Sequence, residues 1–455
     1  MWAQRDARNP RSVAKREIQV NQGFRGAGGL YTVWTMKYFV RTYGCQMNVA
    51  DSNEMGRHLH DRGVTATTDP DEASIMLVNT CTVRHHAEER AFSEIGRLKK
   101  WKALQPGRKI VVTGCAAERT KEHLESRFPY VDLVVGAKSI EDFPSMIERL
   151  LDRRSTDDEL DYAVPTTSDA VSSFVTIMRG CNYSCTYCIV PYVRGRESYQ
   201  PIPQILDEVR DRVREGVREI TLLGQTVNSY HSNGSRGRDT DFSDLLEAVA
   251  GIDGVERIRF MSPHPYYMTD RVIESMAKVL QVCEALHLPV QSGSTPMLRK
   301  MQRNYSRDEY LRLTEKLRSA MPDMTISTDI IVGFPGETDA DFHETLSLIE
   351  EAQFDWGFIF KYSPREGTPA AELPCFSTEL IEARHQECLA VMDGIAAKKR
   401  SRLAGTAQEV LVEEDCFGRT RGNYKVHITG NALPGETVNV RVTDSERPTL
   451  EGTVE

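Results

Sequence analysis

Three short apolar runs near the start of the chain are each followed by a cysteine and then by a stretch with helical spacing. The runs are residues 38–40, 75–78 and 110–112, and the cysteines are Cys45, Cys81 and Cys115. The helical stretches are residues 51–60, 83–104 and 118–127. Strand, cysteine and helix, repeated along a chain, are typical of a parallel sheet. We therefore expect an open parallel sheet in residues 36–150.

A second alternation of strand-like and helical stretches fills the middle of the chain. The strand candidates are residues 174–178, 219–223, 257–261, 285–290, 325–332 and 356–362. The helical stretches between them are residues 202–215, 242–250, 269–279, 306–320 and 339–351. Six βα units are fewer than a complete eight-stranded barrel has, so the pattern predicts a partial (βα)6 barrel in residues 165–397. Its active site should lie at the carboxyl ends of the strands.

The pattern changes again after the basic run at residues 398–402. Short alternating runs at 409–413, 425–428 and 437–442 are separated by glycines. This predicts a small β-barrel in residues 398–455. The fold class is therefore α/β, with an N-terminal open parallel sheet, a central partial barrel and a C-terminal small β-barrel.

Two segments lack apolar periodicity. Residues 1–35 contain several arginines and glycines, and we expect a flexible basic leader there. Such a leader is either an arm that touches RNA or a start with no role, and its composition favours the second interpretation. The charged stretch at residues 152–161 indicates a linker.

Composition narrows the class of protein. A chain of 455 residues can bury the cores of two or three domains. Ten cysteines, most of them clustered, favour a reducing compartment. We expect a cytoplasmic protein with no membrane partner, because no apolar run is long enough for a bilayer span or a signal core. The net charge of −9 gives no support to nucleic-acid binding, although only the binding face of such a protein has to be basic.

Cys181, Cys185 and Cys188 carry the most specific chemistry. Three thiolates in one short loop can bind one iron–sulfur cluster, which normally takes four cysteines. The next cysteine is as far away as Cys283, so one iron is left open to an outside ligand, as in catalytic metal sites. Zinc and plain packing are the alternatives. Zinc usually takes four ligands in two pairs, and the C-x2-C spacing occurs only once here.

Cys45, Cys81 and Cys115 form a second candidate site. The carboxyl ends of parallel strands line one crevice, so cysteines at three strand ends can meet in space. Gly44 and Gly114 allow tight turns beside them. The alternative is three buried thiols in a core, but three cysteines at equivalent positions favour a metal site. We expect a second 4Fe-4S cluster with an open iron, because no fourth cysteine is evident.

These motifs together resemble the methylthiotransferase family of the radical S-adenosylmethionine (SAM) superfamily. The resemblance covers about residues 36–455 and includes, besides the cysteine motifs, residues 222–225, 287–293, 331–338 and 362–368. It implies that SAM binds the open iron on Cys181, Cys185 and Cys188, which are then the catalytic residues. It also implies that residues 36–150 hold an auxiliary cluster. The expected cofactors are two 4Fe-4S clusters and SAM.

The resemblance implies a sulfurtransferase that places a methylthio group on an unactivated carbon. Acid–base chemistry cannot readily break such a C–H bond, whereas a radical supplied by a cofactor can. One SAM would give the 5′-deoxyadenosyl radical. A second SAM would methylate sulfur presented at the auxiliary cluster.

The resemblance also indicates side chains that contact SAM. The cofactor-binding candidates are Tyr187, Gln225, Gly333, Pro335, Gly336 and Glu337. The glycines allow close approach of the backbone, although an ordinary barrel turn is the alternative for this loop. Arg194 and Arg196 are either partners of the SAM carboxylate or an RNA phosphate, or surface arginines. The remaining candidates, His264, His287, Cys283, Cys375, Cys388 and Cys416, are expected to be structural or without metal.

The C-terminal segment resembles the TRAM domain, an RNA-binding barrel. Its candidates for contacting phosphates and bases are Arg419, Arg421, Tyr424 and Lys425. A structural end cap with solvated charges is the alternative.

The loop at residues 224–230 resembles the branch of the family that acts on isopentenylated adenosine next to the anticodon of tRNA. That branch often has Asn where this chain has Thr226. Threonylcarbamoylated adenosine in tRNA and an aspartate of a ribosomal protein are alternative substrates, and a non-catalytic RNA-binding iron–sulfur protein is an alternative from another class. The expected partners are a tRNA anticodon stem-loop, a low-potential electron donor such as flavodoxin or ferredoxin, and a sulfur donor. We expect a monomer.

Overall fold

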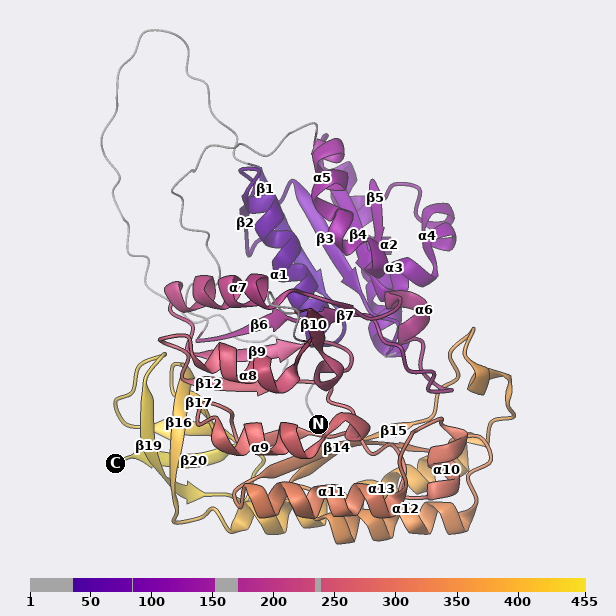
Figure 1. Ribbon diagram of the computed structural model, residues 1–455. Coiled ribbons are helices and arrows are strands. Elements are labelled where there is room, and N and C mark those ends of the chain that lie inside the picture. The colour runs from indigo at the N-terminus through magenta and orange to yellow at the C-terminus, as the bar shows by residue number, and fades with distance from the viewer. Residues whose placement is uncertain (1–35, 84, 152–170, 234–238) are drawn as a thin grey trace. The chain divides into compact units, whose positions relative to one another are not determined.

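The computed structural model describes residues 36–83, 85–151, 171–233 and 239–455 (Figure 1). The expected leader and linker lie outside these residues. The predicted fold class is confirmed, because an open parallel sheet, a partial barrel and a small closed barrel follow one another along the chain. Among the helices of the described ranges, none combines the length and the apolarity that crossing a membrane requires.

The first domain is a parallel sheet of five strands in the order β2-β1-β3-β4-β5. The strands are β1 (Lys37–Thr42), β2 (Thr65–Ala66), β3 (Ile75–Thr80), β4 (Lys109–Gly114) and β5 (Leu133–Gly136). The helices are α1 (Gln46–His60), α2 (His85–Ala103), α3 (Cys115–Arg119), α4 (Lys121–Arg127) and α5 (Phe143–Leu151). One sheet face buries Met76 and Ile110 against α2, and the other buries Ile75 and Val111 against α1 and α5. Burial on both faces explains the continuous apolar runs in the sequence.

The first domain differs from the sequence prediction in one interrupted helix and in elements that were not predicted. The helix expected at residues 118–127 is interrupted at Thr120, whose φ of −119° and ψ of 29° are not helical. The strands β2 and β5 were not predicted, because two and four residues give too little alternation to identify a strand, and the helix α5 was not predicted either.

The second domain contains six parallel strands in sequential order. They are β6 (Ser172–Thr176), β9 (Glu219–Leu223), β12 (Arg257–Phe260), β13 (Ala285–His287), β14 (Thr325–Val332) and β15 (Trp356–Lys361). The intervening helices are α7 (Ile202–Arg214), α8 (Phe242–Ala250), α9 (Asp270–Lys278), α11 (Arg307–Ala320) and α12 (Asp339–Ala352). Two three-stranded sheets, β12-β9-β6 and β13-β14-β15, are joined by a bridge between Ile258 and Val282.

One face of each barrel strand packs on helices and the other faces the lumen. In β15, Ile359 belongs to the core shared with Met392 of α13 (Thr378–Ser401). Side chains alternate along a strand, so Phe358 and Phe360 point to the lumen. They are 48% and 38% exposed. His287 lies on the same face, and its ring centroid is 6.0 Å from that of Phe358. The lumen therefore presents aromatic side chains to solvent along its last strand.

The third domain is a closed barrel of five strands in the order β16-β17-β18-β20-β19. They are β16 (Ala407–Glu414), β17 (Phe417–Thr420), β18 (Lys425–Thr429), β19 (Thr437–Asp444) and β20 (Leu450–Val454). Figure 1 shows these strands in yellow at the end of the chain. Strands β17 and β20 were not identified from the sequence. The expected start at residue 398 lies in the last turn of α13.

The turn between β17 and β18 covers the amino-terminal ends of the barrel strands. Arg259 donates to the carbonyls of Thr420 and Arg421, both at 2.9 Å. Arg257, whose side chain is 1% exposed, donates to the carbonyl of Arg419 at 2.8 Å. These carbonyls accept hydrogen bonds from buried guanidinium groups of the partial barrel. The small barrel therefore stabilises the partial barrel.

Tyr424 joins the two barrels through one strong hydrogen bond. Its buried hydroxyl donates to Oδ1 of Asp355 at 2.9 Å. We expect Tyr424→Phe to lower the free energy of unfolding by about 2 kcal/mol, because a hydrogen bond to a charged group contributes about 1.5–3 kcal/mol. Urea unfolding followed by tryptophan fluorescence measures this change, since Trp356, one of four tryptophans in the chain, has its ring centroid 5.5 Å from that of Tyr424.

Tyr192→Phe is the matched control, because it removes the same hydroxyl from a side chain that is 51% exposed. It should leave the urea midpoint unchanged. Equal midpoints for the wild type and Tyr424→Phe would contradict the structural role of this contact.

Candidate catalytic site

The first cysteine triplet converges at one edge of the sheet. Cys45 caps α1 after β1, Cys81 follows β3 and Cys115 begins α3 after β4. These three strands are neighbours in the sheet. Gly44 has a φ of +138°, and a Cβ atom there would lie 2.7 Å from Cβ of Cys81. A glycine is therefore needed at this position, because a larger residue next to Cys45 would collide with Cys81.

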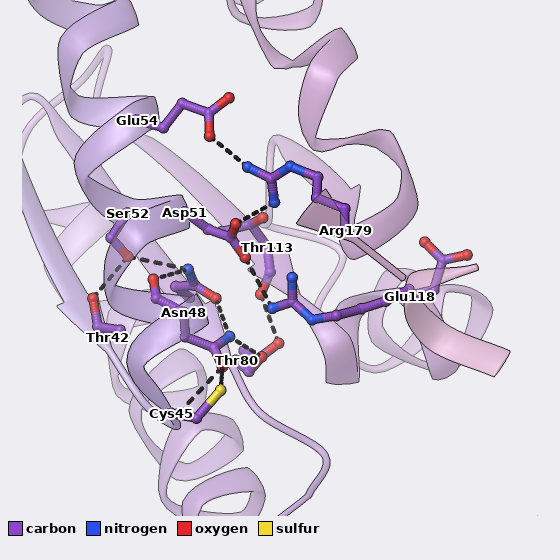
Figure 2. Close-up of polar contacts among 12 residues, drawn as sticks. Thr42, Cys45, Asn48, Asp51, Ser52, Glu54, Thr80, Thr113, Glu118 and Arg179 are labelled. Atoms are coloured by element: carbon purple, nitrogen blue, oxygen red, sulfur yellow. Dashed lines mark hydrogen bonds and ion pairs between the residues drawn. The ribbon is translucent and has the colours of Figure 1, made fainter. Parts of the chain in front are cut away.

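Two buried asparagines, Asn48 and Asn79, hold Cys45 in place, and Figure 2 shows Asn48 beside the cysteine. Oδ1 of Asn48 accepts from Sγ of Cys45 at 3.3 Å, and its amide nitrogen donates to Oδ1 of Asn79 at 2.8 Å. Asn79 in turn donates to the carbonyl of Asn48 at 2.8 Å and to Oγ of Ser52 at 3.0 Å. The amino end of α1 is thereby tied to the carboxyl end of β3. This network fixes the cysteine at the edge of the site.

The thiols of this triplet lie in an apolar environment with a cation nearby. The pKa of Cys115 is raised to about 11, because burial and, to a smaller extent, the neighbouring thiols of Cys81 and Cys45 outweigh the opposing charge of Arg194. Within the described ranges, no three His, Cys, Asp or Glu side chains form a group that could hold a single metal ion. A 4Fe-4S cluster separates its thiolates farther than one ion does, since each binds a different iron. Three converging thiols and a buried guanidinium suit such an anionic group.

The second triplet lies on the loop between β7 (Met178–Arg179) and α6 (Val190–Arg194). Sγ of Cys181 is 3.5 Å from Oγ1 of Thr226, and Nη1 of Arg303 donates to Sγ of Cys185 at 3.5 Å. Burial, together with the neighbouring thiol of Cys185, raises the pKa of Cys188 to about 12. Thr226, the position where the sequence departs from the family branch, thus lies beside a cluster cysteine. Arg303 was not identified from the sequence, because its motif carries no cysteine or glycine signal.

The two triplets adjoin one another. Helix α6 begins two residues after Cys188, and its Val193 packs with Cys115 in one apolar cluster. At the end of β9, Leu223 packs with Met47 of α1, and Cys45 packs against the same cluster. Three residues later Thr226 contacts Cys181. Helix α6 and the end of β9 therefore link both cysteine sites.

Two of the SAM candidates lie close to the second triplet. The ring of Tyr187 is half-buried, with its centroid 6.4 Å from that of Phe334. Both amide atoms of Gln225, which precedes Thr226, are buried without a hydrogen-bond partner. A polar ligand would satisfy these atoms, because buried amide groups are costly when unpaired. The residues present at this site fit SAM.

The candidates in the loop after β14 have partners within the protein. Oε2 of Glu337 accepts from the amide of Gly333 at 2.9 Å and from Arg384 of α13 at 2.7 Å. Lys300 donates to the carbonyl of Gly336 at 2.8 Å. Glu337 and Arg384 therefore fix the shape of the loop around Pro335. Oε1 of Glu337 is buried without a partner and is the atom of this loop that a ligand could still use.

His264 has an unused hydrogen-bond donor that the sequence did not indicate. Its Nδ1 accepts from the amide of Tyr266 at 3.2 Å, so the proton lies on Nε2, which is buried without a partner. Burial and the charge of Arg303 lower the pKa of His264 to about 2, and the ring is therefore neutral. It stacks on Tyr183 of the cysteine loop with centroids 4.1 Å apart. The one feature of the sequence that could have marked His264 is its position after β12, because active sites of such barrels lie at the carboxyl ends of the strands.

The other predicted residues are scattered. Arg194 is buried and paired with Asp51, so the interpretation as a surface arginine is wrong for it, whereas Arg196 is exposed. His287 is satisfied by Ser327 at 2.9 Å and Asp329 at 3.3 Å, as expected for a structural histidine. Cys283 and Cys388 are buried, and Cys375 and Cys416 are exposed.

Each of the four candidates for RNA contact in the small barrel interacts with another side chain of the protein. Arg421 donates to both carboxylate oxygens of Glu284, at 2.7 and 2.9 Å, and Tyr424 is bound to Asp355. Arg419 pairs with Glu413 at 3.2 Å, and Nζ of Lys425 lies 4.5 Å from the ring centroid of Phe417. Arg421 and Tyr424 therefore hold two domains together. Arg419 and Lys425, both half-buried, keep the prediction of RNA contact.

Comparison with known families assigns each domain. Residues 37–136 match the family described as "Uncharacterized protein family UPF0004", residues 175–349 the radical SAM superfamily, and residues 402–454 the TRAM domain. The match to the radical SAM superfamily indicates an iron–sulfur cluster and SAM as cofactors.

Curated relatives resemble the chain over almost its whole length. A tRNA-2-methylthio-N(6)-dimethylallyladenosine synthase of Clostridium botulinum (Loch Maree) is 41% identical over 91% of this chain and 96% of the relative. One of Desulforamulus reducens is 40% identical over 92% of this chain and 95% of the relative. Among solved structures, the radical S-adenosylmethionine methyltransferase TsrM from Kitasatospora setae has a TM-score of 0.55 at 11% identity, covering 82% of this chain and 80% of its own. This last likeness concerns the fold alone.

Proposed function

Since this chain belongs to the family of tRNA-2-methylthio-N(6)-dimethylallyladenosine synthases, we propose that it converts N6-isopentenyladenosine next to the anticodon of tRNA to the 2-methylthio derivative. The observation that carries the proposal is the contact of both cysteine triplets with α6 and the end of β9. A reaction that needs a radical and a sulfur source requires the two groups to reach one substrate carbon. Two separate sites on distant surfaces would not serve it.

Cys181, Cys185 and Cys188 would hold one 4Fe-4S cluster, and Cys45, Cys81 and Cys115 a second one. When bound, the first cluster with SAM supplies a radical that removes hydrogen from carbon, and the second supplies sulfur. Arg303 donates to Sγ of Cys185, and Oγ1 of Thr226 lies 3.5 Å from Sγ of Cys181, so both side chains contact sulfur atoms that would bind this cluster. Tyr187 with Phe334 excludes water from this side of the site, and Gln225 offers amide atoms to SAM.

The lumen-facing aromatics supply a place for the prenyl group of the substrate. Phe358 and Phe360 line up on β15 beside His287, and they are partly exposed although they are large and apolar. An exposed aromatic surface inside a barrel favours a ligand with an apolar tail that stacks or packs against it. This supports isopentenylated adenosine over threonylcarbamoylated adenosine or a ribosomal-protein aspartate, whose side chains are polar.

The test is nucleoside analysis of tRNA. In a strain whose own enzyme of this family is deleted, tRNA should carry N6-isopentenyladenosine without the methylthio group. Expression of this chain should restore the 2-methylthio derivative, which mass spectrometry detects directly. Restoration of a methylthio group on threonylcarbamoyladenosine or on a ribosomal protein instead would replace the proposed substrate. Absence of any methylthiolation in the presence of clusters would favour the non-catalytic RNA-binding protein.

The location, the partners and the oligomeric state of the protein stay predictions. We propose a cytoplasmic monomer that binds the anticodon stem-loop of tRNA and that receives electrons from a low-potential donor such as flavodoxin or ferredoxin and sulfur from a sulfur donor. Arg419 and Lys425 are the proposed contacts of the small barrel with RNA.

A further inference from the structure

Asp51 of α1 binds two arginines of the radical SAM domain. Its Oδ1 accepts from Nη1 of Arg179 at 2.6 Å, and its Oδ2 accepts from Nη2 of Arg194 at 2.9 Å. Figure 2 shows Asp51 and Arg179 in this contact, with Cys45 at the amino end of the helix that carries Asp51. The side chains of Asp51 and Arg194 are only 2% and 4% exposed. A buried carboxylate that bridges two domains is costly unless it fixes something specific.

The charge of Arg194 acts on the auxiliary cysteines. Arg194 ends α6, whose Val193 packs with Cys115. Burial lowers the pKa of Arg194, but the thiolates of Cys115 and Cys45, together with Asp51, raise it, and the net change is upward. The half-buried Arg365 interacts electrostatically with Cys81 and donates to the carbonyl of Val83 at 2.7 Å. Of the two cations, Arg194 is the one shielded from solvent, so its field is the less screened.

The position of Arg194 in the chain makes this contact unusual. It lies six residues after Cys188, in the domain of the first cluster, yet its charge belongs to the site built by Cys45, Cys81 and Cys115. The auxiliary site taken from residues 37–136 alone would be the buried thiols of Cys81 and Cys115, the half-buried thiol of Cys45 and one buried carboxylate. It would lack the cation that balances them.

We propose that Arg194 is a positioning residue of the auxiliary cluster site, which sets the cluster's reduction potential through its charge and completes the site only when the radical SAM domain is docked on α1. The inference rests on the proposed function, because it requires a cluster on Cys45, Cys81 and Cys115. Reduction adds negative charge to such a cluster, so a nearby cation makes its potential more positive and a nearby anion makes it more negative.

Two substitutions separate a charge effect from a packing effect. Arg194→Gln removes the cation, so the midpoint potential of the auxiliary cluster should become more negative. Asp51→Asn removes the anion and leaves the charge of Arg194 near the cysteines, so the potential should become more positive. Both changes break the same ion pair. A merely structural role would move both potentials in the same direction.

The measurement is a redox titration followed by electron paramagnetic resonance of the full-length reconstituted protein. Cys181, Cys185 and Cys188 are replaced by alanine in every sample, so that only the auxiliary cluster gives a signal. Arg194→Lys keeps the charge and should stay close to the parent protein. Arg196→Gln is the matched control, since it removes an exposed arginine two residues away and should leave the potential unchanged.

Opposite shifts for Arg194→Gln and Asp51→Asn, with Arg194→Lys near the parent value, support the inference. Unchanged potentials in both variants, shifts of the same sign, or an Arg194→Lys shift as large as that of Arg194→Gln overturn it and leave the proposed function intact. If the parent protein with the three alanines binds no cluster, the assignment of Cys45, Cys81 and Cys115 fails, and this inference fails with it. If Arg194→Gln does not fold, Arg194→Lys and Asp51→Asn decide the sign.

Discussion

Replacing Cys185 by alanine should abolish SAM cleavage, whereas replacing Cys81 by alanine should spare SAM cleavage and abolish methylthiolation. Cys185 belongs to the triplet that leaves one iron open for SAM, and a cluster held by two thiolates would not present SAM correctly. Cys81 lies at the end of β3, in the other triplet. The measurement is chromatography of 5′-deoxyadenosine and of methylthiolated nucleoside after reduction with dithionite. We expect each lost activity to fall to background.

Iron content provides the internal check of this division. Each variant should keep about half of the iron of the wild type, because one of two 4Fe-4S clusters is lost. Cys375→Ala is the matched control, since Cys375 is exposed and outside both triplets, and it should keep all iron and both activities. Wild-type protein with a single cluster, or with zinc, would contradict the assignment of two triplets. Loss of SAM cleavage in a folded Cys81→Ala protein would contradict the separate roles.

The proximity of the cysteines within each triplet could be predicted from the sequence, because simple geometry connects them. Cys181, Cys185 and Cys188 are close in the chain, and no folding is needed to see that they can share a cluster. Cys45, Cys81 and Cys115 are distant in the chain, but each follows a strand of the same parallel sheet. The carboxyl ends of neighbouring parallel strands lie at one edge. Repetition of one local pattern thus predicted a tertiary contact.

The domain contacts could not be predicted, because they join segments that carry no shared pattern. Arg194 and its partner Asp51 are 143 residues apart, and neither stands in a motif that marks the other. Arg421 and Tyr424 stand on either side of Gly422 in the turn between β17 and β18, and the sequence predicted that this turn is exposed. In the structure this turn meets Glu284 and Asp355 of the central domain. A residue that is predicted to be exposed from the sequence of its own domain can be buried where a second domain packs against it.

The substrate of the enzyme should be recognised by its prenyl group, and the expected effect is large. Burial of an apolar group contributes about 0.8 kcal/mol per CH2, so the five carbons of an isopentenyl group are worth a few kcal/mol. Since 1.36 kcal/mol corresponds to a factor of ten, we expect kcat/KM for a prenylated anticodon stem-loop to exceed that for the unprenylated one on the order of a hundredfold. Methylthiolation rates of the two stem-loops, followed by mass spectrometry, measure this ratio.

Phe358 provides the link from this preference to the structure. Its side chain is 48% exposed on the lumen side of β15, so Phe358→Ala removes apolar surface without opening the helical core. The substitution should lower the rate on the prenylated stem-loop by about tenfold, because a buried aromatic contributes roughly 1.5–3 kcal/mol and this one is only partly covered. The rate on the unprenylated stem-loop should stay the same.

Leu104→Ala, at a position 77% exposed in the first domain, is the control for loss of an apolar side chain elsewhere. An unchanged ratio in Phe358→Ala would remove this residue from the prenyl site, whereas equal wild-type rates on both stem-loops, or activity on a ribosomal protein alone, would rule out the substrate itself.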